Sequence, residues 1–125
     1  MSANRYSPPL VQGVYAAPAA EGAVRATVTI PGSKSLTNRE LIIAAIADGP
    51  GRLISPLHSD DSRRMVDALR ALGVGIEEVD AGGEFGPDLV VTPAKLGGGT
   101  TIDCGQAGTV MRFIAPLAGL AQKDV

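Results

Sequence analysis

Cysteine and aromatic residues are scarce in this chain of 125 residues, which has one cysteine and only 3% aromatic residues. The single cysteine, Cys104, excludes an internal disulfide and a cysteine metal cluster, and it fits a reducing compartment such as the cytosol. With few aromatic side chains, any core has to be built from Ala, Val, Leu and Ile. We therefore expect a cytoplasmic protein in which Cys104 is a small buried residue.

A strong charge of one sign and a long apolar run are also missing. The formal net charge is -2, which argues against a bulk nucleic-acid binder. No run approaches the roughly 20 apolar residues that span a membrane, and residues 1–20 lack the apolar core of a signal peptide. We expect neither a nucleic-acid nor a membrane partner, and the hydrophobic content of 45% is normal for one globular domain.

The densest group of reactive and polar side chains is the stretch Pro31-Gly-Ser-Lys-Ser-Leu-Thr-Asn-Arg39. Apolar residues and threonines alternate before it, which predicts a strand over residues 26–30. The Ala-, Leu- and Ile-rich run after it predicts a helix over about residues 35–47. The helix start offers free backbone N–H groups beside Lys34 and Arg39, so this corner is a candidate site for an anionic ligand.

The next segments complete one structural unit. We predict a strand over residues 52–56, a helix capped by Ser59 or Asp60 with a core stripe of Met65, Val66, Leu69 and Leu72, and strands over 75–79 and 88–92. The order β, α, β, α, β, β over about residues 23–96 indicates a mixed α/β (α+β) fold. Residues 1–22 contain three prolines and predict an extended arm.

We predict that a second unit begins at about residue 97 and runs to the end of the chain, over residues 97–125. A predicted strand over 100–104 is followed by the glycine corner Gly105-Gln-Ala-Gly-Thr109 and by a helix that carries Arg112. Taken alone, the corner could equally be a tight turn, Asp60 and Asp61 could be capping acids, and Arg112 could be a solvated arginine. The only histidine, His58, has no identified partner and is left unassigned.

Three motifs in order carry a resemblance to a known family: the stretch 31–39, Ser59-Asp-Asp61 heading a helix, and Ala107-Gly-Thr109 followed by Arg112. From about Arg25 onward the chain resembles the N-terminal part of EPSP synthases (3-phosphoshikimate 1-carboxyvinyltransferases). The resemblance implies transfer of the enolpyruvyl group of phosphoenolpyruvate to the 5-hydroxyl of shikimate 3-phosphate, with release of phosphate. This is a shikimate-pathway step towards chorismate and the aromatic amino acids, and it uses no metal or redox cofactor.

The resemblance also implies roles for individual residues. Lys34 matches a lysine that touches both substrates, and Ser35 and Arg39 match positions that hold shikimate 3-phosphate. Gly108 matches the glycine that phosphoenolpyruvate or the inhibitor glyphosate approaches. The remaining substrate-binding candidates in the same cleft are Gln106, Thr109 and Arg112, with Asp61 as a weak catalytic candidate. Gln106 stands where asparagine is more usual, and the principal acid and base residues are expected beyond Val125.

The family fold implied by the resemblance has two globular halves, each made of three βαβαββ units, with the active site between them. The arm, residues 1–22, would pack with the C-terminal half, and the full-length enzyme would be a monomer. We therefore expect an N-terminal fragment that is inactive alone. Two alternatives are an enolpyruvyl transferase acting on a UDP-sugar, which the Lys-Ser-x-Thr-Asn-Arg motif disfavours, and a non-catalytic anion-binding or assembly module.

Overall fold

The computed structural model describes residue 13 and residues 17–121. Most of the predicted arm, residues 1–22, and residues 122–125 lie outside this described part. The elements in chain order are α1 (Lys34–Ala45), β1 (Gly51–Leu53), α2 (Asp60–Ala71), β2 (Gly75–Val79), β3 (Asp88–Thr92) and α3 (Gly108–Ala118). None of the described helices is long and apolar enough to cross a membrane.

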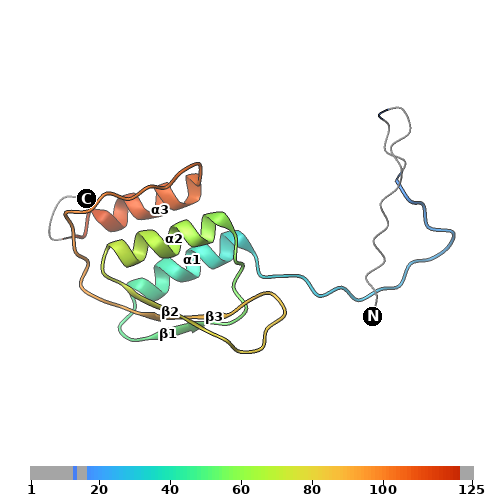
Figure 1. The fold of residues 1–125 in the computed structure, drawn as a ribbon, viewed down its shortest axis with the longest axis horizontal. Coiled ribbons are helices and arrows are strands. Elements are labelled where there is room, and N and C mark those ends of the chain that lie inside the picture. The colour runs from blue at the N-terminus through green and yellow to red at the C-terminus, as the bar shows by residue number, and fades with distance from the viewer. Residues whose placement is uncertain (1–12, 14–16, 122–125) are drawn as a thin grey trace.

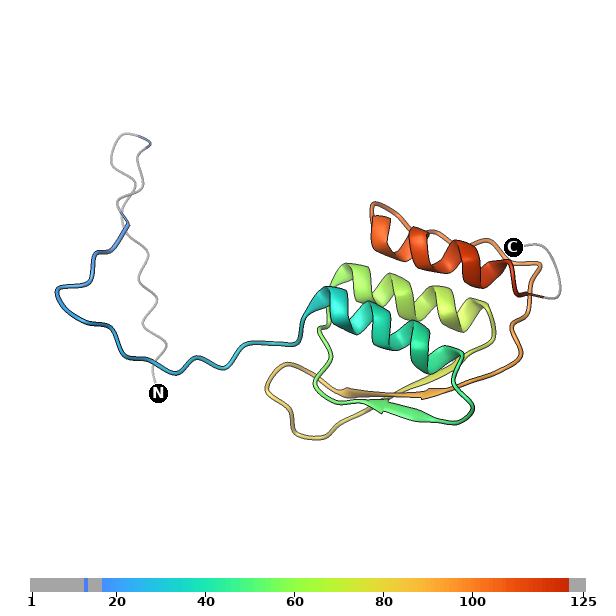
Figure 2. The same ribbon diagram turned by 180° about the vertical axis from the view of Figure 1, so that it is seen from behind.

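The three strands form an antiparallel sheet in the order β1-β3-β2, with Gly51 opposite Val91 and Gly75 opposite Thr92. Helices α1 and α2 pack against this sheet, and α3 packs on α1 and α2. Figures 1 and 2 show that α3 lies on the side of these two helices that faces away from the sheet. The mixed fold of helices and sheet predicted from the sequence is confirmed.

The core lies between the sheet and the helices, and it is aliphatic as expected. The stripe of α2 is confirmed, because Met65, Leu69 and Leu72 have no exposed surface and Val66 is 7% exposed. Burial of each such side chain contributes about 1.5–3 kcal/mol to folding. Ser59, one of the two predicted caps, is the N-cap of α2. Leu41 of α1, Val91 of β3 and Val110 of α3 are equally buried, so one core joins all three layers.

The predicted strand over residues 26–30 is wrong. The described chain is an extended, unpaired segment there, and it leads away from the packed part of the molecule (Figure 1). Val28 and Ile30 are 74% and 75% exposed. Alternation of apolar and polar residues supplies one apolar side, but a strand also needs a neighbour to take its backbone hydrogen bonds. The observed order over residues 23–96 therefore begins with α1, and the repeated-unit prediction is not confirmed.

Two further strand predictions need correction. Residues 100–104 form no strand, although Ile102 and Cys104 pack partly buried against the core and Thr101 and Asp103 face solvent. The strand predicted over 52–56 forms instead at Gly51–Leu53. It ends there because Ser55 has φ +49 and gives its N–H to Asp88 Oδ1 at 2.9 Å, which takes the backbone out of the ladder.

Candidate functional site at the helix starts

The N-termini of α1, α2 and α3 lie at the same end of the molecule. All three helices run in the same direction, and the extended segment before α1 leaves from this end (Figures 1 and 2). Each helix start has backbone N–H groups without an intrahelical partner and the positive end of a dipole. Three such ends side by side favour negative charge more than one end does.

The start of α1 presents Lys34 and Ser35 to solvent. Ser33 is the N-cap, and its Oγ accepts a hydrogen bond from the N–H of Leu36 at 3.4 Å, so one of the predicted free donors is taken. The Nζ of Lys34 lies 2.9 Å from Oδ2 of Asp61 in the first turn of α2. Half of the Lys34 side chain is exposed. The structure thus brings two candidate residues from separate motifs into contact.

The start of α2 is held by side chains. Ser59 and Ser62 form a capping box, and Ser62 Oγ also donates to the carbonyl of Leu57 at 2.6 Å. Thr37 of α1 is buried, and its Oγ1 accepts the N–H of Leu57 at 3.0 Å. These bonds fix α2 against α1 and so fix the position of Asp61 beside Lys34.

The start of α3 is open by comparison. Its N-cap is Ala107, and no described side chain caps the helix. Gly108 is exposed, and a Cβ added there would meet nothing within 4 Å. Gln106 is exposed and Thr109 is half-buried. The N–H of Gly108 donates to the carbonyl of Gln106 at 3.1 Å, so what this helix start leaves open is the exposed Cα side of Gly108.

The two candidate arginines differ in their surroundings. Arg39 donates to the carbonyl of Ser35 at 2.9 Å, and its guanidinium lies 5.5 Å from the ring centroid of Phe113 on α3. It also lines, with Ile42, Ile43 and Phe113, an apolar hollow of about 300 Å³. Arg112 is exposed on α3. Arg39 is oriented by a carbonyl and a ring, which leaves its charge uncompensated by any described acid.

Asn38 of α1 is a buried polar residue to which the sequence alone assigns no role. It is 0% exposed, and neither its Nδ2 nor its Oδ1 has a hydrogen-bond partner among the described residues. A buried amide without partners costs about 1–3 kcal/mol. Its spacing of four residues from Lys34 puts both on the same side of α1, but spacing does not show that the amide is buried without a partner.

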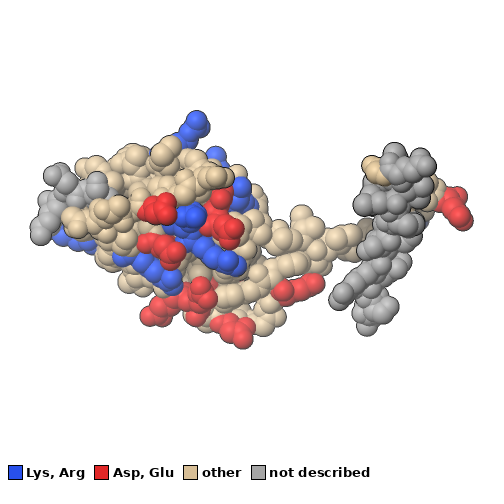
Figure 3. Space-filling view, turned by 45° about the horizontal axis from the view of Figure 1, so that its top comes forward, with Lys and Arg blue, Asp and Glu red and all other residues tan. Residues whose placement is uncertain are grey.

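Charge on the described surface is mixed. Figure 3 shows lysines and arginines interleaved with acids on one face, without a broad patch of one sign. Four of the five described ion pairs tie α2 residues to acids or bases nearby, in the pairs Lys34–Asp61, Arg63–Asp60, Arg64–Asp103 and Arg70–Asp67. Attraction for an anion is thus local to the helix starts.

Comparison with known proteins gives the family. The family described as EPSP synthase (3-phosphoshikimate 1-carboxyvinyltransferase) matches residues 18–125. A 3-phosphoshikimate 1-carboxyvinyltransferase of Kocuria rhizophila is 50% identical over 78% of this chain and 23% of its own length. The structure of an EPSP synthase from Acinetobacter baumannii is similar with a TM-score of 0.60 and 26% identity, over 78% of this chain and 21% of that one. The chain spans about a quarter of the length of these relatives, and it belongs to the EPSP synthase family.

Proposed function

We propose that these residues serve transfer of the enolpyruvyl group of phosphoenolpyruvate to the 5-hydroxyl of shikimate 3-phosphate, with release of phosphate. Their share of the work is to bind and orient the two substrates. The observation that carries the proposal is the gathering of three helix starts around Lys34 and Gly108. Family membership and the printed activity of the Kocuria relative support it.

The chemistry of the substrates fits this end of the molecule. Both are multiply anionic, so each repels the other unless fixed positive charge lies between them. Lys34 and the helix dipoles supply that charge, and holding the substrates in contact converts an encounter into a positioned reaction. The proposed reaction needs no redox cofactor or metal, and its acid and base are not assigned among the described residues.

Lys34 has to exchange its partner when substrate binds. It is paired with Asp61 in a half-exposed ion pair, and such pairs contribute only about 0.2–1 kcal/mol. A phosphate or carboxylate of the substrate can therefore take the place of Asp61 at small cost. Asp61 would then lie beside the reacting groups, as a candidate catalytic residue.

The remaining assignments follow from position. Ser35 and Arg39 are proposed to hold shikimate 3-phosphate, because both are exposed on α1 and Arg39 has no described acid as a partner. Gly108 is proposed to meet phosphoenolpyruvate through its open backbone, with Gln106, Thr109 and Arg112 around it. The cytoplasm is proposed as the location, on the ground of a single cysteine.

Substitution of Lys34 tests the proposal. The assay uses an enzyme in which this chain is extended with the remaining sequence of a relative. Lys34→Ala is expected to reduce phosphate release with both substrates by about 100-fold or more, and to change the free energy of unfolding by less than about 1 kcal/mol, since the pair is exposed. Lys95→Ala, at an exposed lysine after β3, is the matched control and should leave both unchanged. Parallel loss of activity and stability, or activity equal to the control, would contradict the proposal.

Calorimetric titration separates the two acceptor substrates. Shikimate 3-phosphate should bind the same enzyme and a UDP-sugar should not. Binding of the UDP-sugar alone would assign the chain to the other class of enolpyruvyl transferase.

A further inference from the structure

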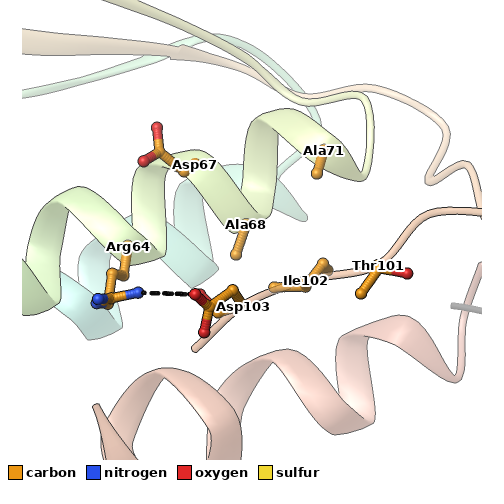
Figure 4. A pocket seen from close by; sticks show the side chains of 7 residues that line it. All are labelled: Arg64, Asp67, Ala68, Ala71, Thr101, Ile102 and Asp103. Atoms are coloured by element: carbon orange, nitrogen blue, oxygen red, sulfur yellow. Dashed lines mark hydrogen bonds and ion pairs between the residues drawn. The ribbon is translucent and has the colours of Figure 1, made fainter. Parts of the chain in front are cut away.

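The coil before α3 is tied to α2 across a hollow. The hollow has a volume of about 270 Å³ and is lined by Arg64, Asp67, Ala68 and Ala71 of α2 and by Thr101, Ile102 and Asp103 of the coil. Figure 4 shows Arg64 reaching from α2 to Asp103. One guanidinium nitrogen of Arg64 lies 3.5 Å from Oδ2 of Asp103 and 3.4 Å from its carbonyl oxygen.

Asp103 connects Arg64 to Gly105. Its other carboxylate oxygen, Oδ1, accepts the N–H of Gly105 at 2.7 Å. Gly105 has φ +52, a conformation that glycine adopts without the penalty of a side chain. An added Cβ at Gly105 would collide with the guanidinium carbon of Arg64 and lie 2.8 Å from two of its nitrogens. The guanidinium therefore lies directly against Gly105.

The corner that Arg64 touches determines where α3 begins. The N–H of Ala107 donates to the carbonyl of Cys104 at 3.0 Å, and Ala107 is 4% exposed. Gly108 follows immediately and has no described side chain capping its helix. Arg64 and Asp103 are thus the described side chains that bind the backbone of this corner.

We propose that Arg64 is a positioning residue for Gly108. Acting through Asp103 and Gly105, it holds the corner so that the backbone of Gly108 faces the ligand at the helix starts. Its effect on substrate rests on the proposed function, in which Gly108 meets phosphoenolpyruvate. Arg64 itself touches no substrate. Because the ion pair is exposed, with 41% and 84% of the two side chains accessible, its role is local order more than global stability.

Amide hydrogen exchange of the 125-residue chain tests the hold on the corner without any ligand. Arg64→Met keeps the apolar stem and removes the guanidinium. The hydrogen-bonded amides of Gly105 and Ala107 should then exchange about 3- to 10-fold faster, while those of α2 stay unchanged. Arg64→Lys should restore part of the protection. Arg63→Met is the matched control, because Arg63 pairs with Asp60 on its own helix. Equal exchange in Arg64→Met and Arg63→Met, or faster exchange throughout the chain, would overturn the proposal.

Steady-state kinetics test whether Arg64 affects substrate binding. The enzyme for this test is this chain extended with the remaining sequence of the Kocuria relative. Arg64→Met should raise KM for phosphoenolpyruvate about 3- to 10-fold and leave KM for shikimate 3-phosphate within about 2-fold, since only the corner moves. An equal rise in both would contradict a role at Gly108. If the parent enzyme has no turnover, the proposed function fails, and the exchange result alone then decides whether Arg64 holds the corner.

Discussion

The connections that lead into α2 and α3 differ in how they are held. Residues 54–59, before α2, are bound by side chains of several elements: Asp88 binds the N–H of Ser55, Thr37 that of Leu57, and Ser62 the carbonyl of Leu57. His58 adds a contact of 2.7 Å from its Nε2 to the carbonyl of Pro87. Residues 103–107, before α3, are held by Asp103 and Arg64 among the described side chains.

The difference separates residues that the fold requires from residues that it leaves free. The hydrogen bonds of the first connection are made within the protein, so folding alone explains the residues that make them. The second ends at Gly108 in a helix start that no described side chain caps, and Gly108 is exposed there. A ligand can be the missing cap there.

The largest effect is expected at Asp88, the buried acid of the first connection. Asp88 is 4% exposed and lies 2.9 Å and 2.8 Å from two nitrogens of Arg52. Asp88→Ala leaves both Arg52 and the N–H of Ser55 without this acceptor, and the urea midpoint should fall more than for any change below. Glu84→Ala, at an exposed acid in the loop before Asp88, is the control. Equal midpoints for the two variants would contradict the importance of the first connection.

Acid should weaken the same connection. The hydrogen bond from the N–H of Ser55, together with that from Arg52 and its charge, lowers the pKa of Asp88 below its ordinary value of 3.8 although burial opposes the shift. The unfolded chain thus takes up this proton first as the pH falls, so the contribution is complete above about pH 4 and is lost as the pH falls through the folded pKa. Denaturation between pH 6 and pH 2 should show a steeper loss for the wild type than for Asp88→Asn. Parallel profiles would contradict the assignment.

Ser62→Ala should have the next largest effect. Ser62 is 3% exposed, donates to Leu57 and accepts the N–H of Ser59 at 2.7 Å. Its removal leaves the part-buried carbonyl of Leu57 and the start of α2 without these bonds, so the free energy of unfolding should fall by about 1–3 kcal/mol. Ser35→Ala, at an exposed serine of α1, should change it by less than about 0.5 kcal/mol. A similar stability for the two variants would remove the contrast between the connections.

The first connection was also the more predictable from sequence. The cap at Ser59 and the stripe that includes Met65 and Leu69 are local signals, and they predict α2 almost to the residue. Strands β2 and β3 were predicted with their observed bounds. Residues 26–30 and 100–104 carry the alternation of a strand without a partner beside them, and local alternation cannot supply the partner.

The candidate site was predictable in part. Spacing within the motifs placed Lys34 and Gly108 at helix starts, and both lie there. The contact between Lys34 and Asp61, and that between Arg64 and Asp103, join residues far apart in the chain. Such pairs depend on how the helices pack, which a pattern within one helix does not encode. The substrate contacts assigned to these residues stay predictions.

Gly105→Ala measures how far the fold depends on the second connection. The positive φ costs a residue with a side chain about 1–2 kcal/mol, and the added Cβ also displaces the guanidinium of Arg64. The free energy of unfolding should fall by about 1–2 kcal/mol in urea denaturation. In an Arg64→Ala background the loss should be smaller, because the collision is gone. An equal loss in both backgrounds would mean that the backbone alone sets the cost.

Gly108→Ala should have the smallest effect on folding. Gly108 has no positive φ, and an added Cβ meets nothing within 4 Å, whereas the same change at Gly105 meets Arg64. Alanine also favours the helix more than glycine does, so the free energy of unfolding should stay within about 0.5 kcal/mol or rise slightly. A glycine that folding does not need, at an uncapped helix start, fits the proposed approach of phosphoenolpyruvate to Gly108. In an enzyme extended with the remaining sequence of a relative, Gly108→Ala should therefore weaken the binding of phosphoenolpyruvate and leave the urea midpoint unchanged. A lowered midpoint with unchanged binding would show that the fold, and not the ligand, requires Gly108.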